Sequence, residues 1–289
     1  MDNDYVVPCQ TPARAARDGA AIVKVVILCG GQGTRIRELT ELIPKPMVEV
    51  GGHPILWQIM KIYSHYSYKD FILCLGYKGD VIRNYFLQYD LLHSDFTVEL
   101  GGKRITPHTC SHDEQDWRIC LAETGADTMT GGRLKNIEQY VDEDVFMLTY
   151  GDGVADIDID ALLSFHKTHG RIATVTAVRP VARFGELELD GDLARSFQEK
   201  PQTNEGWING GFFVFNRRIF DYLDGDDCIL EREPLGRLAS EGELAVYRHH
   251  GYWRCMDTQR DAEFLNAEWA NGNPPWAVWQ APLSDGAAA

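Results

Sequence analysis

Four short, predominantly apolar runs constrain the fold of this chain more than any other feature of its sequence. They occupy residues 22–28, 71–75, 145–149 and 172–178, and segments of helical character at residues 55–66, 80–89, 132–140 and 158–169 alternate with them. Strands that are apolar at nearly every position are typical of a sheet covered on both faces, and alternation with helices indicates parallel pairing. The sequence therefore predicts an α/β fold with a Rossmann-like, mostly parallel sheet flanked by helices.

The second half of the chain has a different pattern. Shorter apolar segments at residues 187–189, 193–199, 207–215 and 244–248 lie close together, with Gly and Asn between them. Such spacing predicts additional antiparallel strands beside a ligand cleft. We expect a single domain at residues 23–280, preceded by a polar extension at residues 1–22 and followed by a tail at residues 281–289. The tryptophan-rich segment 269–279 is interpreted as a packing or subunit contact rather than a ligand site.

Composition excludes several classes of protein. The 43 acidic and 28 basic residues give a formal net charge of −15, which argues against a nucleic-acid partner. No apolar stretch is long enough to cross a membrane and residues 1–22 lack a signal core, so a cytoplasmic protein without a membrane partner is expected. The seven cysteines form no Cys-x-x-Cys pair and are interpreted as buried thiols. The nine histidines show no metal-binding spacing and are interpreted as surface groups.

A glycine-rich segment follows the first apolar run. Three glycines stand between residues 30 and 33, and Arg35 and Lys45 come after them. Bare backbone can approach an anion closely and the two cations can neutralise it, so the segment indicates a phosphate site. Neither standard phosphate loop fits, because no lysine follows Gly33 and Ile36 stands where a dinucleotide fingerprint needs glycine. The alternative is an ordinary strand-to-helix turn.

Two aspartates are candidate metal ligands. Asp152 lies between two glycines directly after the run at residues 145–149, at the strand end where open α/β sheets bind ligands. Asp257 follows a short apolar stretch, just ahead of a helix that we expect to begin near Arg260. Each has an ordinary alternative, a turn aspartate and a helix N-cap respectively. Together they suit Mg²⁺, which takes one or two protein carboxylates and fills its other positions with water and phosphate oxygens.

Further polar groups are candidates for substrate binding. Glu199 and Lys200 end a predicted strand, and Asn209 precedes two glycines. A carboxylate that accepts from hydroxyls beside an ammonium that binds phosphate suits a sugar phosphate, although a solvated strand end and a bulged strand are the alternatives. Thr128 and Arg133 open a predicted helix, where a capped N-terminus with a solvated arginine is the ordinary interpretation.

These motifs occur in an order that resembles the sugar nucleotidyltransferase family. The matching blocks are GGQGTR, PKPMVEVGGHPILW, TGADTMTGGRLK, TYGDGVAD, SFQEKP, INGGFFVFN and MDTQRD, and several of them point to its cytidylyl branch. The resemblance implies that CTP and α-D-glucose 1-phosphate react with Mg²⁺ to give CDP-glucose and pyrophosphate. It also implies a homo-oligomer that serves nucleotide-sugar synthesis for surface polysaccharide.

The resemblance also implies roles for individual residues. The glycine-rich segment would wrap the triphosphate through Leu28, Cys29, Gly30, Gly31, Gln32, Gly33, Thr34 and Arg35, and Arg35 and Lys45 would bind the reacting phosphates. Mg²⁺ would be bound by Asp152 and Asp257. The cytosine would contact Thr128 and Arg133, the nucleotide would contact Gly151, and the glucose phosphate would contact Glu199, Lys200 and Asn209. A different triphosphate such as dTTP or UTP, or a different sugar 1-phosphate, is the rival within the class. A non-catalytic nucleotide-sugar-binding module is the rival from another class, which the intact charged residues argue against.

Overall fold

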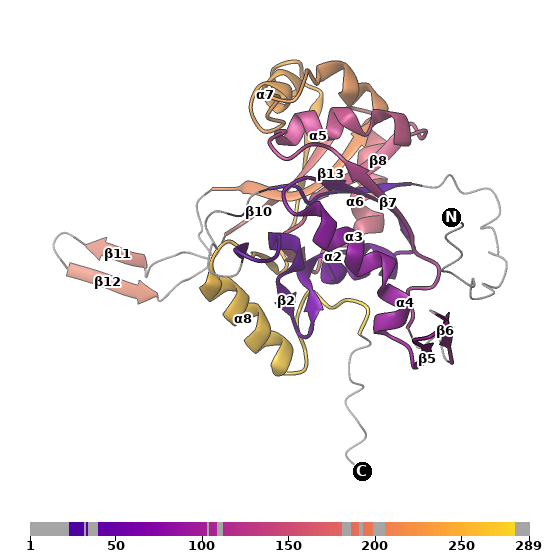
Figure 1. Cartoon of the computed structure of the whole chain (residues 1–289). Helices are drawn as coiled ribbons and strands as arrows, with labels where there is room; N and C mark the ends of the chain where they lie inside the picture. Colours follow the sequence, from indigo (N-terminus) through magenta and orange to yellow (C-terminus); the bar gives the residue numbers. More distant parts are fainter. Residues whose placement is uncertain are drawn as a thin grey trace, which may run out of the picture.

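The computed structural model describes residues 23–31, 33, 40–102, 104–108, 112–180, 186–190, 193–198 and 206–280, with backbone alone for residues 186–190 and 193–198. A twisted sheet runs through the middle of the molecule with helices on both sides (Figure 1). Five of the predicted site residues lie outside the described residues: Gln32, Thr34, Arg35, Glu199 and Lys200.

In the described part of the chain, the central sheet has seven strands in the order β14-β10-β13-β8-β1-β4-β7. Their bounds are β1 Val25–Leu28, β4 Asp70–Leu75, β7 Arg118–Glu123, β8 Val145–Tyr150, β10 Ala173–Val178, β13 Ile208–Asn216 and β14 Leu244–Arg248. Only β13 runs antiparallel to its neighbours, β10 and β8. The predicted mostly parallel sheet is therefore confirmed, and the four apolar runs are β1, β4, β8 and β10.

The pairing of β14 corrects one prediction. The sequence predicted an antiparallel addition at residues 244–248, but β14 pairs with β10 in parallel. The chain does reverse direction after β13, because both Phe215 at the end of β13 and Leu244 at the start of β14 lie beside Ala173. After β13 the chain crosses to the far side of β10 and enters the sheet there as β14. The neighbour of β14 is therefore β10, to which it is parallel, and not β13.

Helices cover both faces of the sheet. Their bounds are α2 Ile55–His65, α3 Gly79–Leu87, α4 Tyr89–Leu92, α5 Thr130–Asn136, α6 Ile159–His169, α7 Glu233–Ser240 and α8 Gln259–Ala270, with 3-10 turns η2 Lys45–Met47, η3 Glu138–Tyr140 and η4 Arg217–Tyr222. The predicted helix at 80–89 divides into α3 and α4, and the one at 132–140 begins at Thr130 and continues into η3.

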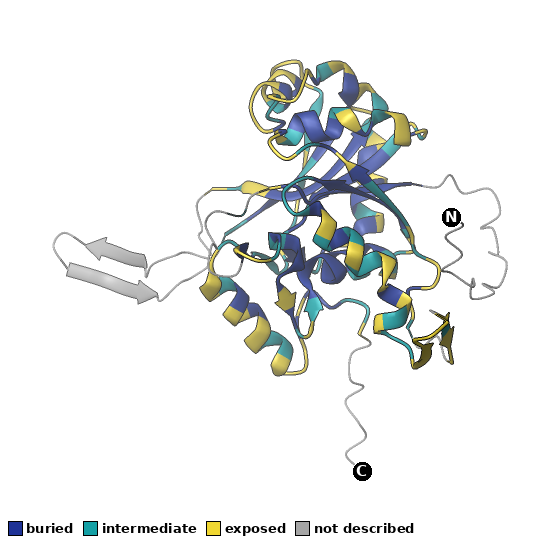
Figure 2. Cartoon of the chain, viewed as in Figure 1, coloured by how far each residue is buried: buried dark blue, intermediate teal, exposed yellow. Residues whose placement is uncertain are grey.

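The alternation of side chains along β1 explains why its whole sequence is apolar. Val25 and Ile27 belong to the core cluster that includes residues of α2, α3, α6 and α8, whereas Val26 and Leu28 belong to the cluster that includes residues of α5, η4 and α7. Successive side chains of a strand point to opposite faces, so a sheet with two covered faces needs no polar positions. The buried residues accordingly form a continuous layer through the molecule (Figure 2).

Four two-stranded antiparallel sheets complete the described structure. They pair β2 Glu49–Val50 with β3 His53–Pro54, β5 Phe96–Glu99 with β6 Arg104–Pro107, β9 Gly153–Ala155 with β15 Trp253–Cys255, and β11 Glu186–Asp190 with β12 Leu193–Gln198. The antiparallel pair predicted near residues 187–199 is β11 with β12, which form a two-stranded sheet of their own and are not strands of the central sheet. The pair of β9 with β15 is the one that builds the site.

The tryptophan-rich segment packs against the core. Trp276 is fully buried and its indole N–H donates to the Gln58 side chain at 3.3 Å. Trp269 lies over Gly51, where a Cβ would come within 2.3 Å of the indole ring. The packing role predicted for this segment fits these contacts.

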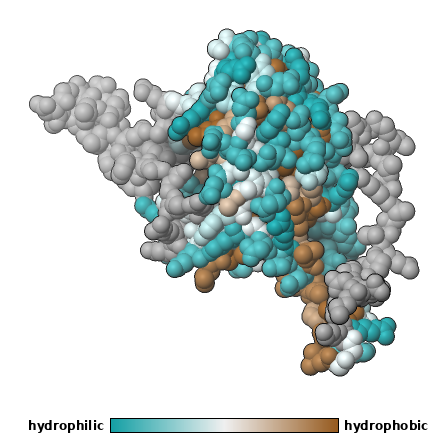
Figure 3. Space-filling model, turned by 45° about the horizontal axis from the view of Figure 1, so that its top comes forward, coloured by the Kyte–Doolittle hydropathy of each residue, from teal (hydrophilic) through white to brown (hydrophobic). Residues whose placement is uncertain are grey.

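The surface and the helices add two observations. The face in Figure 3 is mostly hydrophilic, with smaller groups of apolar residues among the polar ones. Among the described residues, no helix combines the length and the hydrophobicity that crossing a membrane requires.

Candidate active site

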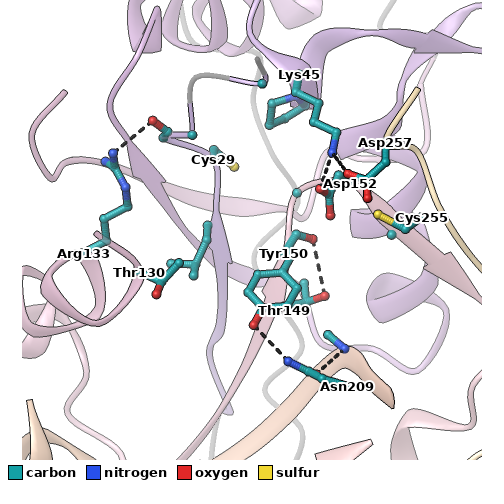
Figure 4. Close-up of a pocket in the computed structure, with 18 of the residues that line it drawn as sticks. Cys29, Lys45, Thr130, Arg133, Thr149, Tyr150, Asp152, Asn209, Cys255 and Asp257 are labelled. Atoms are coloured by element: carbon teal, nitrogen blue, oxygen red, sulfur yellow. Dashed lines mark hydrogen bonds and ion pairs between the residues drawn. The ribbon is translucent and has the colours of Figure 1, made fainter. Parts of the chain in front are cut away.

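A cleft of about 560 Å³ opens where β1 and β8 end and β13 begins. These three ends share one edge because β1 and β8 are parallel and β13 is antiparallel to β8. Every predicted site residue that the structure describes lines this cleft: Leu28, Cys29, Gly30, Gly31, Gly33, Lys45, Thr128, Arg133, Gly151, Asp152, Asn209 and Asp257 (Figure 4). The placement brings the candidates together, while the roles assigned to them remain predictions.

Lys45 lies between the two aspartates. Its ammonium is 2.6 Å from a carboxylate oxygen of Asp152 and 2.7 Å from one of Asp257 (Figure 4). Burial lowers the pKa of Lys45, but the two carboxylates outweigh that effect and the net pKa is raised, so the side chain stays charged. A single cationic centre is thus held by carboxylates from two distant parts of the sequence.

The small sheet of β9 and β15 positions the two acids. Asp152 lies in the turn between β8 and β9, and Asp257 follows β15 by two residues. Cys255 pairs with Gly153 across this sheet, and the Met256 N–H donates to the Asp152 carbonyl at 2.9 Å. Asp257 does not cap α8, because the N-cap is Thr258, whose side chain accepts from the backbone of Asp261. The N-cap interpretation of Asp257 is therefore wrong.

The donor set fits a hard divalent cation. Ligand atoms of Asp152, Cys255 and Asp257 lie within 4.8 Å of one another. Cys255 offers a soft sulfur atom, whereas a hard cation such as Mg²⁺ prefers oxygen ligands. The two carboxylates remain, and two carboxylates that already converge on one cation are the set that Mg²⁺ uses when phosphate oxygens complete its coordination.

Arg133 builds a wall of the cleft from behind the glycine-rich segment. The side chain is only 4% exposed, so the interpretation as a solvated arginine at a helix start is wrong. Its guanidinium donates to the carbonyls of Leu75, Gly125, Gly30 and Ala126 and to the hydroxyl of Thr124, at 2.7–3.3 Å. A Cβ on Gly30 would lie 2.1 Å from this guanidinium, which explains the need for glycine there.

Three polar residues of the site escaped the sequence analysis. Tyr150, at the end of β8, lines the cleft, and its hydroxyl accepts from the Asn209 amide at 3.1 Å and donates to Glu231 at 2.5 Å. The hydroxyl of Thr130 donates to the other oxygen of Glu231 at 2.6 Å. Tyr150 adjoins Gly151 and could have been found from its position after an apolar strand, but Glu231 has no local signal because only the tertiary fold brings it here.

Comparisons with known proteins find relatives that span most of the chain. The nucleotidyl transferase family model matches residues 24–254. The glucose-1-phosphate cytidylyltransferase of Salmonella typhi is 50% identical over 260 residues, which cover 89% of this chain and 100% of the relative. A probable glucose-1-phosphate cytidylyltransferase of Bacillus subtilis (strain 168) is 45% identical over 258 residues, again 89% of this chain and 100% of the relative.

The fold is also known from solved structures. HddC from Yersinia pseudotuberculosis, complexed with GMP-PN, superposes with a TM-score of 0.64 at 23% identity, covering 86% of this chain and 99% of that one. With the family model spanning most of its sequence and a curated relative at 50% identity along 89% of its length, the chain belongs to the nucleotidyl transferase family.

Proposed function

We propose that the protein is a glucose-1-phosphate cytidylyltransferase, which transfers the cytidylyl group of CTP to α-D-glucose 1-phosphate and releases CDP-glucose and pyrophosphate. The glucose-1-phosphate cytidylyltransferase of Salmonella typhi and the probable one of Bacillus subtilis are 50% and 45% identical to the chain over 89% of its length. The observation that carries the proposal is the convergence of Lys45, Asp152 and Asp257 beside the glycine-rich segment, in one cleft. An acidic protein that gathers cationic groups locally can bring two polyanions together.

The reaction is an in-line displacement at phosphorus. An oxygen of the sugar phosphate forms a bond to the α-phosphorus of CTP, the bond from that phosphorus to the bridging oxygen breaks, and pyrophosphate leaves with the electron pair. No general base is needed, because a phosphate monoester is largely ionised at neutral pH. The protein therefore contributes position and charge stabilisation rather than proton transfer.

The residues of the cleft divide this work between them. The Lys45 ammonium neutralises charge on the reacting phosphates, and the bare amides of Gly30 and Gly31 approach them closely. Asp152 and Asp257 would hold Mg²⁺, which when bound supplies positive charge to the phosphate oxygens as a Lewis acid. Arg35, Thr34, Gln32, Glu199 and Lys200 keep the roles predicted for them from the sequence.

The assembly and location are part of the proposal. A homo-oligomer is supported by exposed apolar side chains near one edge of the sheet, on α3, α4, β5 and the following turn: Leu87, Leu92, Phe96, Val98 and Leu100. Residues 23–280 would act as one domain, located in the cytoplasm, between the terminal segments 1–22 and 281–289.

Pyrophosphate release tests the proposed activity directly. The purified protein is incubated with glucose 1-phosphate and Mg²⁺, and with CTP, UTP, dTTP or GTP in separate reactions. We expect CTP to give the highest kcat/KM. Turnover with dTTP or UTP but not CTP would refute the cytidylyl assignment while preserving the reaction class, and binding without turnover of any triphosphate would favour the non-catalytic module.

A further inference from the structure

A chain of hydrogen bonds links polar side chains along the part of the cleft that β8 and β13 form. The Asn209 amide donates to the Tyr150 hydroxyl at 3.1 Å, and that hydroxyl donates to Glu231 at 2.5 Å. Thr130 donates to the second carboxylate oxygen at 2.6 Å and accepts from the Leu230 N–H at 3.0 Å. The four side chains come from β13, β8, the segment before α7 and the first turn of α5, so the chain joins four separate elements.

The direction of every bond in this chain is fixed. The Tyr150 hydroxyl has a single proton and lies 2.5 Å from a carboxylate oxygen of Glu231, a group that only accepts, so the proton goes to the carboxylate. The side-chain oxygen of Asn209 accepts from the Gly211 N–H at 2.8 Å, which leaves the amide nitrogen to face Tyr150. The phenolic oxygen has two lone pairs, and Asn209 takes one of them. The other is available to a donor in the cleft.

Packing holds the ring of Tyr150 in place. Gly211 has a φ of +81°, and a Cβ there would lie 2.7 Å from the tyrosine ring. Phe213 contacts the ring edge-to-face at a centroid distance of 5.9 Å. A ring fixed by these contacts and a hydroxyl fixed by Glu231 present one acceptor at a defined position, which is what selective recognition of a hydroxyl group requires.

The position in the sheet indicates which substrate this acceptor meets. Asn209 belongs to β13, two strands from β1, which the glycine-rich segment follows, and the Tyr150 hydroxyl on the intervening β8 is hydrogen-bonded toward Asn209. The described members of the chain carry no cation, so they suit a neutral hydroxyl-bearing group rather than phosphate. The sugar ring of the second substrate has such groups.

We propose that the Tyr150 hydroxyl accepts a hydrogen bond from one ring hydroxyl of the sugar 1-phosphate, and that Glu231 is the positioning residue that orients it. The proposal rests on the proposed function, since it assumes a sugar phosphate in the β13 half of the cleft. Tyr150 and Glu231 then contribute to sugar specificity, and Glu231 acts only through the tyrosine.

Steady-state kinetics of Tyr150→Phe, Glu231→Gln and the double variant test this assignment. We expect Tyr150→Phe to raise KM for glucose 1-phosphate about 5- to 10-fold, the loss of one neutral hydrogen bond, while KM for CTP stays within about twofold. Glu231→Gln should raise the same KM about threefold. In the double variant, Glu231→Gln should add nothing to Tyr150→Phe, because the group through which it acts is gone.

Deoxygenated substrates separate a hydroxyl contact from a structural effect. The wild type and Tyr150→Phe are compared on the 2-, 3-, 4- and 6-deoxy analogues of glucose 1-phosphate. For one analogue, the one that lacks the contacted hydroxyl, the two proteins should have equal kcat/KM within about twofold. If Tyr150→Phe lowers kcat/KM for all four analogues as much as it does for glucose 1-phosphate, or if it raises KM for CTP instead, the proposal is overturned.

A matched control lies outside the cleft. Tyr222 donates to Glu241 at 2.5 Å, a pair with the same chemistry on the surface, so Tyr222→Phe should leave both KM values unchanged. The wild-type protein is assayed first. If the wild type does not turn over CTP with glucose 1-phosphate, the proposed function is refuted. The variants are then compared with the wild type on the triphosphate and sugar 1-phosphate that the wild type does turn over. Normal wild-type turnover with unaltered variants would refute the present assignment alone.

Discussion

Lys45 shows how one residue can hold a site in a competent arrangement. Its ammonium lies 2.6 and 2.7 Å from carboxylates that would otherwise repel each other. With 13% of its side chain exposed, the lysine is shielded enough for the attraction to exceed that of a surface pair. The same cation that keeps the carboxylates together is available to phosphate oxygens when a divalent ion takes its place between them.

Asp152→Asn tests the charge at this position. The variant should lower kcat by about 10²–10³, the loss typical of one preorganised charge-stabilising group, with the thermal unfolding midpoint little changed because Lys45 keeps Asp257. Pyrophosphate release and circular dichroism give the two readouts. Asp116→Asn is the matched control, since the Lys69–Asp116 pair has the same 2.6 Å separation at an exposed site. Near-normal pyrophosphate release by Asp152→Asn would remove Asp152 from the proposed site.

The residues that the sequence could identify share one property. Asp152 and Asn209 adjoin the ends of apolar strands, and the strand end locates the ligand edge of an open α/β sheet. Arg133 and Glu231 belong to other elements, and their contacts depend on which carbonyls and hydroxyls the fold brings to them. Local sequence indicates only a helix start at Arg133 and gives no signal at Glu231. The contacts of both residues could therefore be found only from the three-dimensional structure.

At the level of elements, α6 packs on β10 through a buried histidine. His166 is 2% exposed and bonds to the Thr174 hydroxyl at 2.9 Å, while His169 approaches the same hydroxyl at 2.7 Å. The interpretation of every histidine as a surface group is therefore wrong for His166. The helical spacing from Leu162 and Leu163 already places it on the buried face, and an imidazole can be buried when a partner is supplied.

This contact predicts a loss of stability in acid. Burial, with His169 and Lys167, lowers the pKa of His166 to about 4 from the usual histidine value of about 6.5. Between these pH values the unfolded chain is protonated and the folded protein is not, so stability falls as the pH falls. The contribution lost is about 3 kcal/mol. Urea unfolding at pH 7 and pH 4.5 should show a smaller pH difference for His166→Gln than for the wild type.

An exposed histidine provides the comparison. His65, at the end of α2, is exposed, and His65→Gln should keep the pH difference of the wild type. Equal pH differences in wild type and His166→Gln would contradict the burial argument.

Sequence patterns also located most helices and strands but missed β7 and the partner of β14, because strand order is decided by packing across the whole sheet.

For the whole molecule, charge and apolar surface have separate consequences. A net charge of −15 opposes non-specific association, yet Leu87 and Leu100 are 76% and 86% exposed, with Leu92, Phe96 and Val98 between them in sequence. We propose that these exposed apolar side chains are covered in an assembly. The charge makes a specific contact, rather than general aggregation, the expected result.

Light scattering of the purified protein measures that assembly. We expect a particle heavier than the 32.6 kDa chain, and a smaller particle when Leu92→Glu and Val98→Glu are combined. Val246→Glu changes an exposed residue of β14, at the other edge of the sheet from β7, and should leave the mass unchanged. A monomeric wild-type protein would contradict the homo-oligomer.

The wide separation of Lys45 and Asp257 along the chain has a consequence for biosynthesis. These residues are 212 positions apart and meet because β15 pairs with β9. Because both lie in one domain, and a domain folds as a unit, a nascent polypeptide on the ribosome cannot bring them together until translation has passed residue 257. A chain that terminates upstream lacks one carboxylate partner of Lys45 and core residues such as Leu265 and Trp276.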